Sequence, residues 1–172
     1  MKLPLNWLFE YAEPIMTPRA IADRLAMTGT EVDRIHHHGV SELEYFVIGK
    51  VLTCEQHPNA DRLRVTTVDV GDGEPSHIVC GAPNVAAGQT VGVAKPGAIM
   101  PDGTRLKKAK LRGEPSEGMI LAEDELAIGV SHSGIMILDD ALEAGTFLAE
   151  VLPIATDVLE LEITPNRPDC LS

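Results

Sequence analysis

Short runs of apolar or alternating residues follow one another between residues 46 and 122, and glycine, proline, asparagine or aspartate separates them. Alternation with a period of two is typical of half-buried strands, and the turn formers mark where each strand ends. We therefore expect strand-like runs at 46–54, 63–70, 77–80, 90–94, 105–111 and 119–122. Such spacing predicts a small barrel or sandwich. About five strands with a mid-chain connection is the pattern of an OB-fold, although other small barrels share it.

Two short helices are predicted before residue 30. Trp7 and Tyr11 lie four residues apart, which gives the first helix an apolar face. The second helix begins with Thr17 as its N-cap and Pro18 in its first turn, and it ends at Gly29. Its expected buried positions are Ile21, Ala22 and Leu25.

The remaining elements are short. Residues 31–35 alternate like a strand, whereas residues 36–38, three adjacent histidines, are interpreted as an exposed loop because adjacent residues do not share one face. Residues 123–126 predict an acidic helical turn, and residues 147–152 predict a short helix. From Val158 to Thr164 the chain alternates again, with Leu159, Leu161 and Ile163 on one face.

These patterns predict an α+β chain built around a small barrel, with a five-stranded OB-fold β-barrel among the candidates. The barrel domain covers residues 39–152. Residues 1–38 form a helical and strand segment that cannot bury much alone, so we expect it to pack with the strand-containing C-terminal extension. Residues 153–172 are interpreted as the truncated start of a following domain, which makes the chain the N-terminal piece of a longer one.

Composition narrows the class of protein. Hydrophobic residues make up 44% of the 172 residues but aromatic residues only 3%, so the core must be aliphatic. No run approaches the roughly 20 apolar residues that span a membrane. The N-terminus lacks the apolar stretch and cleavage site of a signal peptide. Three cysteines, an odd number, fit a reducing compartment, and we expect a cytoplasmic protein.

Charge is distributed unevenly along the chain. The total is −12, but residues 46–115 carry +2 while residues 116–172 carry −11. Five of the eight residues from 105 to 112 are basic, and Lys50, Arg62, Arg64 and Lys95 could join them. A basic surface of this kind holds phosphates and loses affinity as salt rises. A lysine-protected edge strand explains the run about equally well. Few aromatic residues are available to stack bases, which favours phosphate and shape recognition.

The sequence gives little indication of a metal site or a catalytic centre. The pairs Cys54-x-x-His57 and His77-x-x-Cys80 would suit zinc, but residues three apart on a strand point to opposite faces. Buried cysteines and loop histidines explain these positions better. No nucleotide-binding loop or nucleophile motif is present. We therefore predict neither a catalytic residue nor a metal site.

Three motifs carry a specific resemblance. Residues 57–63 (HPNADRL), residues 78–84 (IVCGAPN) and residues 110–119 (KLRGEPSEGM) together resemble the tRNA-binding OB-fold module of several aminoacyl-tRNA synthetases and free-standing tRNA-binding proteins. In that family the Ser-x-x-Met element, here Ser116 and Met119, is associated with tRNA binding. We interpret residues 57–63 as a turn that presents Arg62, with His57 a weak candidate for RNA contact.

The flanking segments resemble one kind of synthetase subunit. Residues 1–8, 29–32, 132–135 and 161–169 are similar to the start of the bacterial phenylalanine–tRNA ligase beta subunit, and the resemblance covers essentially the whole chain. It implies an enzyme of two alpha and two beta subunits that uses ATP and magnesium to charge tRNA with phenylalanine. In that family catalysis belongs to the alpha subunit, and the editing, magnesium-linked and anticodon-binding parts lie beyond residue 172.

The resemblance implies an accessory tRNA-binding role for this chain, with tRNA, the alpha subunit and a second beta subunit as partners. No cofactor is expected in the fragment itself. A structural or protein-interaction module with little RNA contact, and a free-standing tRNA-binding protein, are the alternatives. The predicted RNA-binding residues are Lys50, Arg62, Arg64, Arg105, Lys107, Lys108, Lys110, Arg112, Ser116 and Met119.

Overall fold

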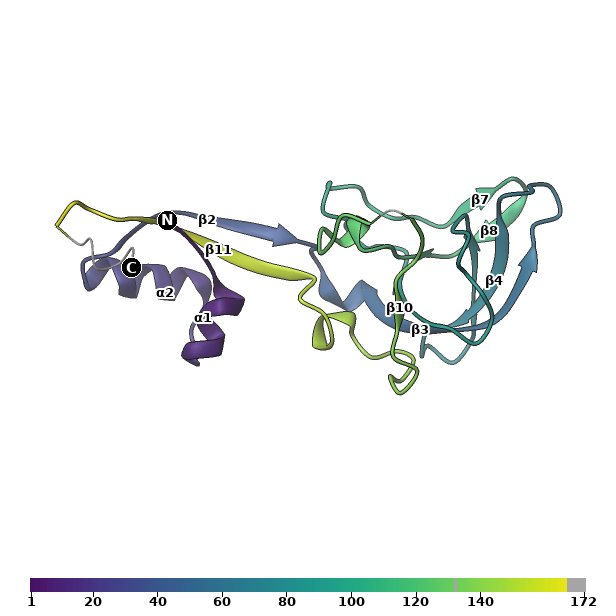
Figure 1. Ribbon diagram of the computed structural model, residues 1–172, viewed down its shortest axis with the longest axis horizontal. Helices are drawn as coiled ribbons and strands as arrows, with labels where there is room; N and C mark the ends of the chain where they lie inside the picture. The colour runs from purple at the N-terminus through teal and green to yellow at the C-terminus, as the bar shows by residue number, and fades with distance from the viewer. Residues whose placement is uncertain (132, 167–172) are drawn as a thin grey trace. The chain divides into compact units, whose positions relative to one another are not determined.

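A computed structural model describes residues 1–131 and 133–166 (Figure 1). The chain divides into two compact units: residues 1–38 with the segment from Ala155 onward form unit 1, and Gly39–Ile154 forms unit 2. Helices and mostly antiparallel strands occur together, so the predicted α+β class is confirmed. No helix in the described part of the chain is long and apolar enough to cross a membrane.

Unit 1 combines two helices with a three-stranded sheet. Its elements are β1 (Lys2–Pro4), α1 (Leu5–Tyr11), α2 (Pro18–Met27), β2 (Glu31–Gly39) and β11 (Ala155–Glu162). The strand order is β1-β11-β2, so β11 lies between two strands from the beginning of the chain. The core is aliphatic and consists of Leu5, Ile21, Leu159 and Leu161, with partly buried residues around them.

The predicted start and end of α2 are confirmed. The Thr17 side chain accepts a hydrogen bond from the Ala20 backbone N–H at 3.3 Å, and Pro18 is the first helical residue. This cap satisfies one of the donors that a helix start leaves free. The chain leaves the helix at Gly29, whose φ of 94° lies in the left-handed region that glycine adopts readily.

The loop prediction for residues 36–38 is wrong, because all three histidines belong to β2. The His36 Nε2 lies 2.7 Å from the Glu160 carboxylate, and the His37 Nδ1 lies 3.1 Å from that of Asp157. Both carboxylates are on β11, which is next to β2 in the sheet. A polar run can therefore form a strand here because a partner distant in sequence supplies cross-strand pairs.

Unit 2 is organised around one antiparallel sheet. The strand order is β10-β6-β3-β4-β5, and β9 also pairs with β6. These strands are β3 (Phe46–Gln56), β4 (Arg64–Asp69), β5 (Ser76–Cys80), β6 (Thr90–Ala94), β9 (Met119–Ile120) and β10 (Ile137–Leu138). Strands were predicted at the first four of these positions and at β9, and they are confirmed. Short 3₁₀ helices accompany them at η1 (Leu43–Tyr45), η2 (Asp124–Leu126) and η3 (Leu148–Glu150).

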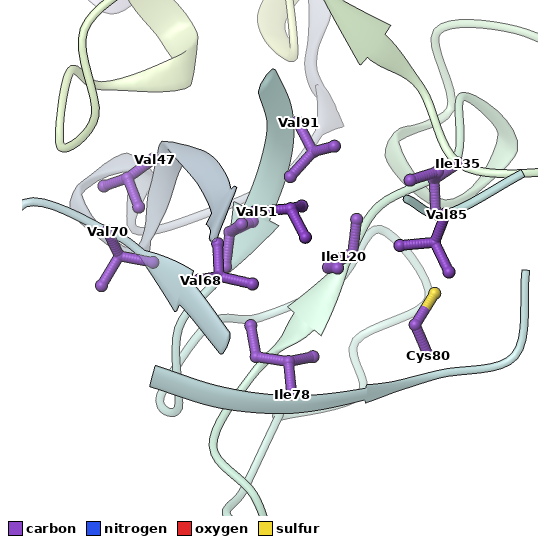
Figure 2. Close-up of a cluster of buried hydrophobic side chains, with 11 residues drawn as sticks. Val47, Val51, Val68, Val70, Ile78, Cys80, Val85, Val91, Ile120 and Ile135 are labelled. Carbon is purple, nitrogen blue, oxygen red and sulfur yellow. The ribbon is translucent and has the colours of Figure 1, made fainter. Parts of the chain in front are cut away.

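The hydrogen bonding of unit 2 continues beyond the sheet edge at β5. The Glu117 N–H donates to the His77 carbonyl at 2.7 Å, and β9, which follows at once, pairs with β6. Following hydrogen-bonded neighbours therefore leads from β6 to β3, β4 and β5 in turn. The segment from Glu117 to β9 then connects β5 back to β6. Figure 2 shows the side chains of one cluster that this arrangement encloses; apart from Cys80 they are aliphatic, which confirms the predicted aliphatic core.

The strand predicted at 105–111 is wrong over its first half. Arg105 makes only an isolated bridge to Ile99, and the Leu106 N–H donates to the Ala98 carbonyl. This segment therefore pairs with the loop just before it. Only β7 (Ala109–Leu111) is a strand, and it forms a separate two-stranded sheet with β8 (Glu114–Ser116).

Candidate nucleic-acid interface

The centre of the candidate interface is the basic hairpin, defined as β7, β8 and the two residues between them. Leu111 pairs with Glu114, so Arg112 and Gly113 form a two-residue turn. Their φ angles are both positive, 54° and 104°. Positive φ angles are required in the two-residue turns whose twist matches that of the flanking strands. Lys110 and Arg112 are both exposed. The hairpin therefore presents two exposed cations, Arg112 in the turn and Lys110 on β7.

The 57–63 loop, which joins β3 to β4, fixes this hairpin in place. His57 is only 3% exposed, and its Nε2 lies 3.0 Å from the Leu111 carbonyl oxygen. Its Nδ1 accepts from the Asn59 N–H at 3.0 Å, so the tautomer that satisfies both bonds carries its proton on Nε2. The Asn59 amide donates to the Arg112 carbonyl at 3.4 Å. His57 is thus a buried anchor, and its interpretation as a weak RNA contact is wrong.

The loop is also closed on itself. The Gln56 side-chain amide donates to three carbonyls of the loop, those of Ala60, Asp61 and Leu63, at 3.0, 3.1 and 3.2 Å. Arg62 lies in this loop, and Arg64 follows it as the first residue of β4. Both arginines are exposed. Since the loop is docked on the hairpin turn, four exposed cations gather at one end of unit 2: Arg62, Arg64, Lys110 and Arg112.

Other predicted residues lie elsewhere or are engaged within the chain. Lys50 donates to the Asp140 carbonyl at 3.2 Å, and it is six residues, about 20 Å, along β3 from the strand's end at the loop. The Arg105 guanidinium lies 3.5 Å from Glu42. Neither residue joins the four cations. Lys107 is exposed and lies between Arg105 and the hairpin.

Lys108 is exposed but is held by a carboxylate. Its ammonium donates to Glu117 at 2.6 Å. This hydrogen bond and the lysine charge hold the pKa of the Glu117 carboxyl below its ordinary value. Lys108 therefore has a partner that a phosphate would have to displace.

Ser116 and Met119 face inward. Ser116 is 4% exposed; its hydroxyl accepts from the Val79 N–H and donates to the Gly118 carbonyl, both at 3.1 Å. Met119 is partly buried against a core cluster. The Ser-x-x-Met element thus joins the hairpin to β5 and the core, and a direct RNA contact by Ser116 does not fit its burial.

The cysteines and histidines whose spacing would suit zinc have other roles. Both ring nitrogens of His57 are in hydrogen bonds to the chain, and the Cys54 thiol donates to the Val85 carbonyl at 3.5 Å. Burial raises the pKa of the Cys80 thiol, which disfavours the thiolate that zinc needs. Within residues 1–131 and 133–166 no group of three or more His, Cys, Asp or Glu side chains could hold a metal ion.

Comparison with known proteins agrees with this geometry. Residues 46–147 match the family described as "Putative tRNA binding domain". The chain belongs to this tRNA-binding domain family. The matched segment contains the 57–63 loop and the whole basic hairpin.

Other proteins are similar to this chain over its full length. It is 49% identical over 172 residues to the phenylalanine–tRNA ligase beta subunit of Nitratidesulfovibrio vulgaris, covering 100% of this chain and 21% of that protein. It is 48% identical over 178 residues to the same subunit of Bacteroides thetaiotaomicron, covering 100% and 22%. The predicted resemblance to these beta subunits is confirmed, and the chain spans about a fifth of their length.

A partial likeness to a solved structure was also found. The C-terminal domain of Plasmodium vivax p43 is 25% identical, with a TM-score of 0.44 over 58% of this chain and 56% of that one.

Proposed function

We propose that this chain is the accessory tRNA-binding region of a phenylalanine–tRNA ligase beta subunit. The observation that carries the proposal is the docking of the basic hairpin on the 57–63 loop through His57 and Asn59. This docking holds exposed cations from two separate segments at one end of unit 2. Membership of the tRNA-binding domain family supports the same role.

We further propose that unit 2 is a five-stranded OB-fold barrel formed by β3, β4, β5, β6 and β9. Oligonucleotides bind OB-folds at the face of the second and third strands, bordered by the first-to-second and fourth-to-fifth connections. Here those strands are β4 and β5. The 57–63 loop is the first-to-second connection, and the basic hairpin lies in the connection from β6 to β9. The proposed interface thus coincides with the usual OB-fold binding face.

The proposed recognition is electrostatic. Arg62, Arg64, Lys110 and Arg112 would meet the sugar–phosphate backbone and release its counterions. Arginine suits this role because its planar fork pairs with phosphate oxygens through two parallel hydrogen bonds. Lys107 and Lys108 extend the same surface, the latter after leaving Glu117. Bound tRNA is then recognised mainly by shape and by backbone position.

In the whole protein we propose that this region serves the ATP- and magnesium-dependent charging of tRNA with phenylalanine in the cytoplasm. The alpha subunit and a second beta subunit would complete a heterotetramer. Residues 39–152 would be the tRNA-binding domain, residues 1–38 would pack with the C-terminal extension, and residues 153–172 would lead into the next domain. We place the ATP and magnesium sites of the whole enzyme outside this region.

Direct binding to tRNA tests this proposal. Arg62→Gln with Arg64→Gln removes two proposed phosphate contacts, and we expect the affinity for labelled tRNA to fall at least tenfold at low salt, measured by fluorescence anisotropy. Lys50→Gln with Lys95→Gln changes the charge equally and serves as the control, because Lys50 lies far along β3 and Lys95, which follows β6, is paired with Asp72 at 3.3 Å. Equal losses for both double variants would show that net charge, and not this interface, governs binding.

A second role is proposed for unit 1. Trp7 is 61% exposed, Tyr11 88% and Ile15 101%, although all three are large apolar side chains. Exposed apolar groups in one small unit are typical of a surface that another protein part covers. We propose that this surface contacts the alpha subunit of the synthetase. Trp7→Ser with Tyr11→Ser should weaken assembly with the alpha subunit in sedimentation velocity while leaving tRNA binding unchanged; unaltered assembly would refute the role.

A further inference from the structure

An open pocket of about 390 Å³ lies beside the proposed interface. Its walls come from the end of β5 and the residues after it, from the segment that begins at β9, and from residues 134–135. Its volume is within the range of small-ligand pockets. Figure 2 shows Cys80, Ile120 and Ile135 projecting from these three separate segments. Pro83 and Met119 add further apolar surface.

Among the pocket residues that the structure describes, one carries a charged group, the carboxylate of Glu125. Its Oε2 accepts a hydrogen bond from the Ala122 N–H at 2.7 Å, which fixes the position of the carboxylate. No other hydrogen bond to Glu125 involves a residue within 1–131 or 133–166. An ionised carboxylate only accepts, and it has about four lone-pair sites, so most of its capacity is unused. A ligand that fits this pocket should therefore carry N–H donors on a flat apolar body.

The pocket is lined by residues that neighbour the proposed tRNA surface. Cys80, which lines the pocket, is directly opposite Arg64 in the β4–β5 ladder. Gly81, also in the lining, lies against the Leu63 side chain at the end of the 57–63 loop. Paired strands are about 5 Å apart, so a nucleotide whose phosphate meets Arg64 has its base within reach of the pocket.

We propose that the pocket holds one unpaired guanine base of the bound RNA, with Glu125 accepting from its N1–H and N2–H groups. This inference deepens the proposed tRNA-binding function and rests on it. Guanine alone presents two adjacent N–H donors on its Watson–Crick edge. Adenine and cytosine place an acceptor beside their amino group, and uracil places two carbonyls beside its single N–H, so each would face the carboxylate with a repelling lone pair.

The apolar walls of the pocket suit the two faces of a base. The barrel has few aromatic residues, so bases cannot stack on the platforms that most RNA-binding domains use. Pro83 and Met119 offer flat or adaptable apolar surface to the faces of a base instead. Sequence preference would then come from one pocket, while the cations supply most of the affinity.

Titration of the 172-residue chain with the four nucleoside monophosphates, followed by amide chemical shifts of Gly81 and Ile135, tests the proposal. GMP should bind about tenfold more tightly than AMP, CMP or UMP, as a two-bond contact to a base edge allows. Glu125→Gln keeps an oxygen for the Ala122 N–H but turns the other arm into a donor. It should reduce the preference to within about twofold, whereas Glu123→Gln, on an exposed neighbour, should leave it unchanged.

A second variant tests whether GMP binds in the pocket itself, independently of any change at Glu125. Ala82→Leu fills part of the pocket and should weaken binding of GMP without altering the unfolding temperature by much. Equal affinity for all four nucleotides, or a guanine preference that survives both Glu125→Gln and Ala82→Leu, would overturn the inference while leaving salt-dependent tRNA binding intact. A parent chain that prefers GMP but binds no tRNA would instead overturn the proposed tRNA-binding function, and with it the assignment of the guanine to bound RNA.

Discussion

His57 joins the 57–63 loop to the basic hairpin, and its replacement is the most direct test of that attachment. In His57→Ala two hydrogen bonds disappear: the one to the Leu111 carbonyl at 3.0 Å and the one from the Asn59 N–H at 3.0 Å. Each is worth about 1 kcal/mol net. Water can reach the Leu111 carbonyl after the change, because Leu111 is exposed, so the penalty of an unpaired buried group applies only in part.

The loss of the buried ring adds to this cost. The imidazole is almost fully shielded from solvent (3% exposed), so its removal leaves a cavity or lets the loop collapse. Either result lowers the free energy of unfolding by about 1 kcal/mol. We therefore expect His57→Ala to destabilise unit 2 by about 2–3 kcal/mol. His57→Asn can retain an acceptor for the Asn59 N–H, and His57→Gln can retain a donor to the Leu111 carbonyl. Each should recover about 1 kcal/mol.

Hydrogen exchange and urea unfolding measure these effects together. The Asn59 amide should exchange at least 10-fold faster in His57→Ala, since a 1.4 kcal/mol loss changes an opening equilibrium tenfold, and it should be protected again in His57→Asn. His77→Ala, which removes an exposed histidine from β5, is the control. A His57→Ala protein within about 0.5 kcal/mol of the parent, with unchanged exchange at Asn59, would refute the reasoning that this side chain anchors the hairpin.

Three further substitutions test separate parts of the account. Glu117→Gln frees the Lys108 ammonium and should raise tRNA affinity a few-fold at low salt, measured by anisotropy. Gly71→Ala adds a methyl 2.5 Å from a backbone Cα at φ +80°, and urea unfolding should show a loss of about 2–4 kcal/mol. The hydrogen bond from His36 lowers the pKa of Glu160 from 4.5, so it stabilises unit 1 above pH 4.5 and less as pH falls; His36→Ala should raise that pKa in an NMR titration.

Each of these has a matched control. Glu74→Gln removes an exposed carboxylate away from the hairpin and should not change tRNA affinity. Gly73→Ala carries the same strain at φ +89° with no atom within 4 Å, so its difference from the Gly71 variant measures the clash. His38→Ala should leave the pKa of Glu160 unchanged. Equal behaviour of variant and control in any pair would refute the corresponding contact.

The elements that the sequence predicted well are those with local signals. Thr17 and Pro18 mark the start of α2 within one turn of chain, and Gly71 ends a strand that its own alternation defines. The histidine run in β2 carries no such signal, because its strand depends on Glu160 and Asp157 more than 100 residues away. Residues 105–108 have the composition of a strand but do not form one, and Arg105 and Leu106 instead pair with the loop just before them.

The candidate site was predictable in composition but not in arrangement. Charge alone identified Lys110 and Arg112, while nothing local distinguished them from Lys50, which lies far along β3. The role of His57 depends on a contact 54 residues away in sequence, so it could be found only from the structure. Ser116 was assigned to RNA from family resemblance, yet its hydroxyl is used inside the chain.

The salt dependence of tRNA binding tests the central claim most directly. Four phosphate contacts predict a slope of log affinity against log salt of about −3 to −4. In Lys110→Gln with Arg112→Gln the slope should become shallower by about 1.5 to 2, whereas Lys50→Gln with Lys95→Gln should preserve it. A slope near zero for the parent chain, or one that the hairpin variant leaves unchanged, would contradict the proposal that the basic hairpin binds the tRNA backbone.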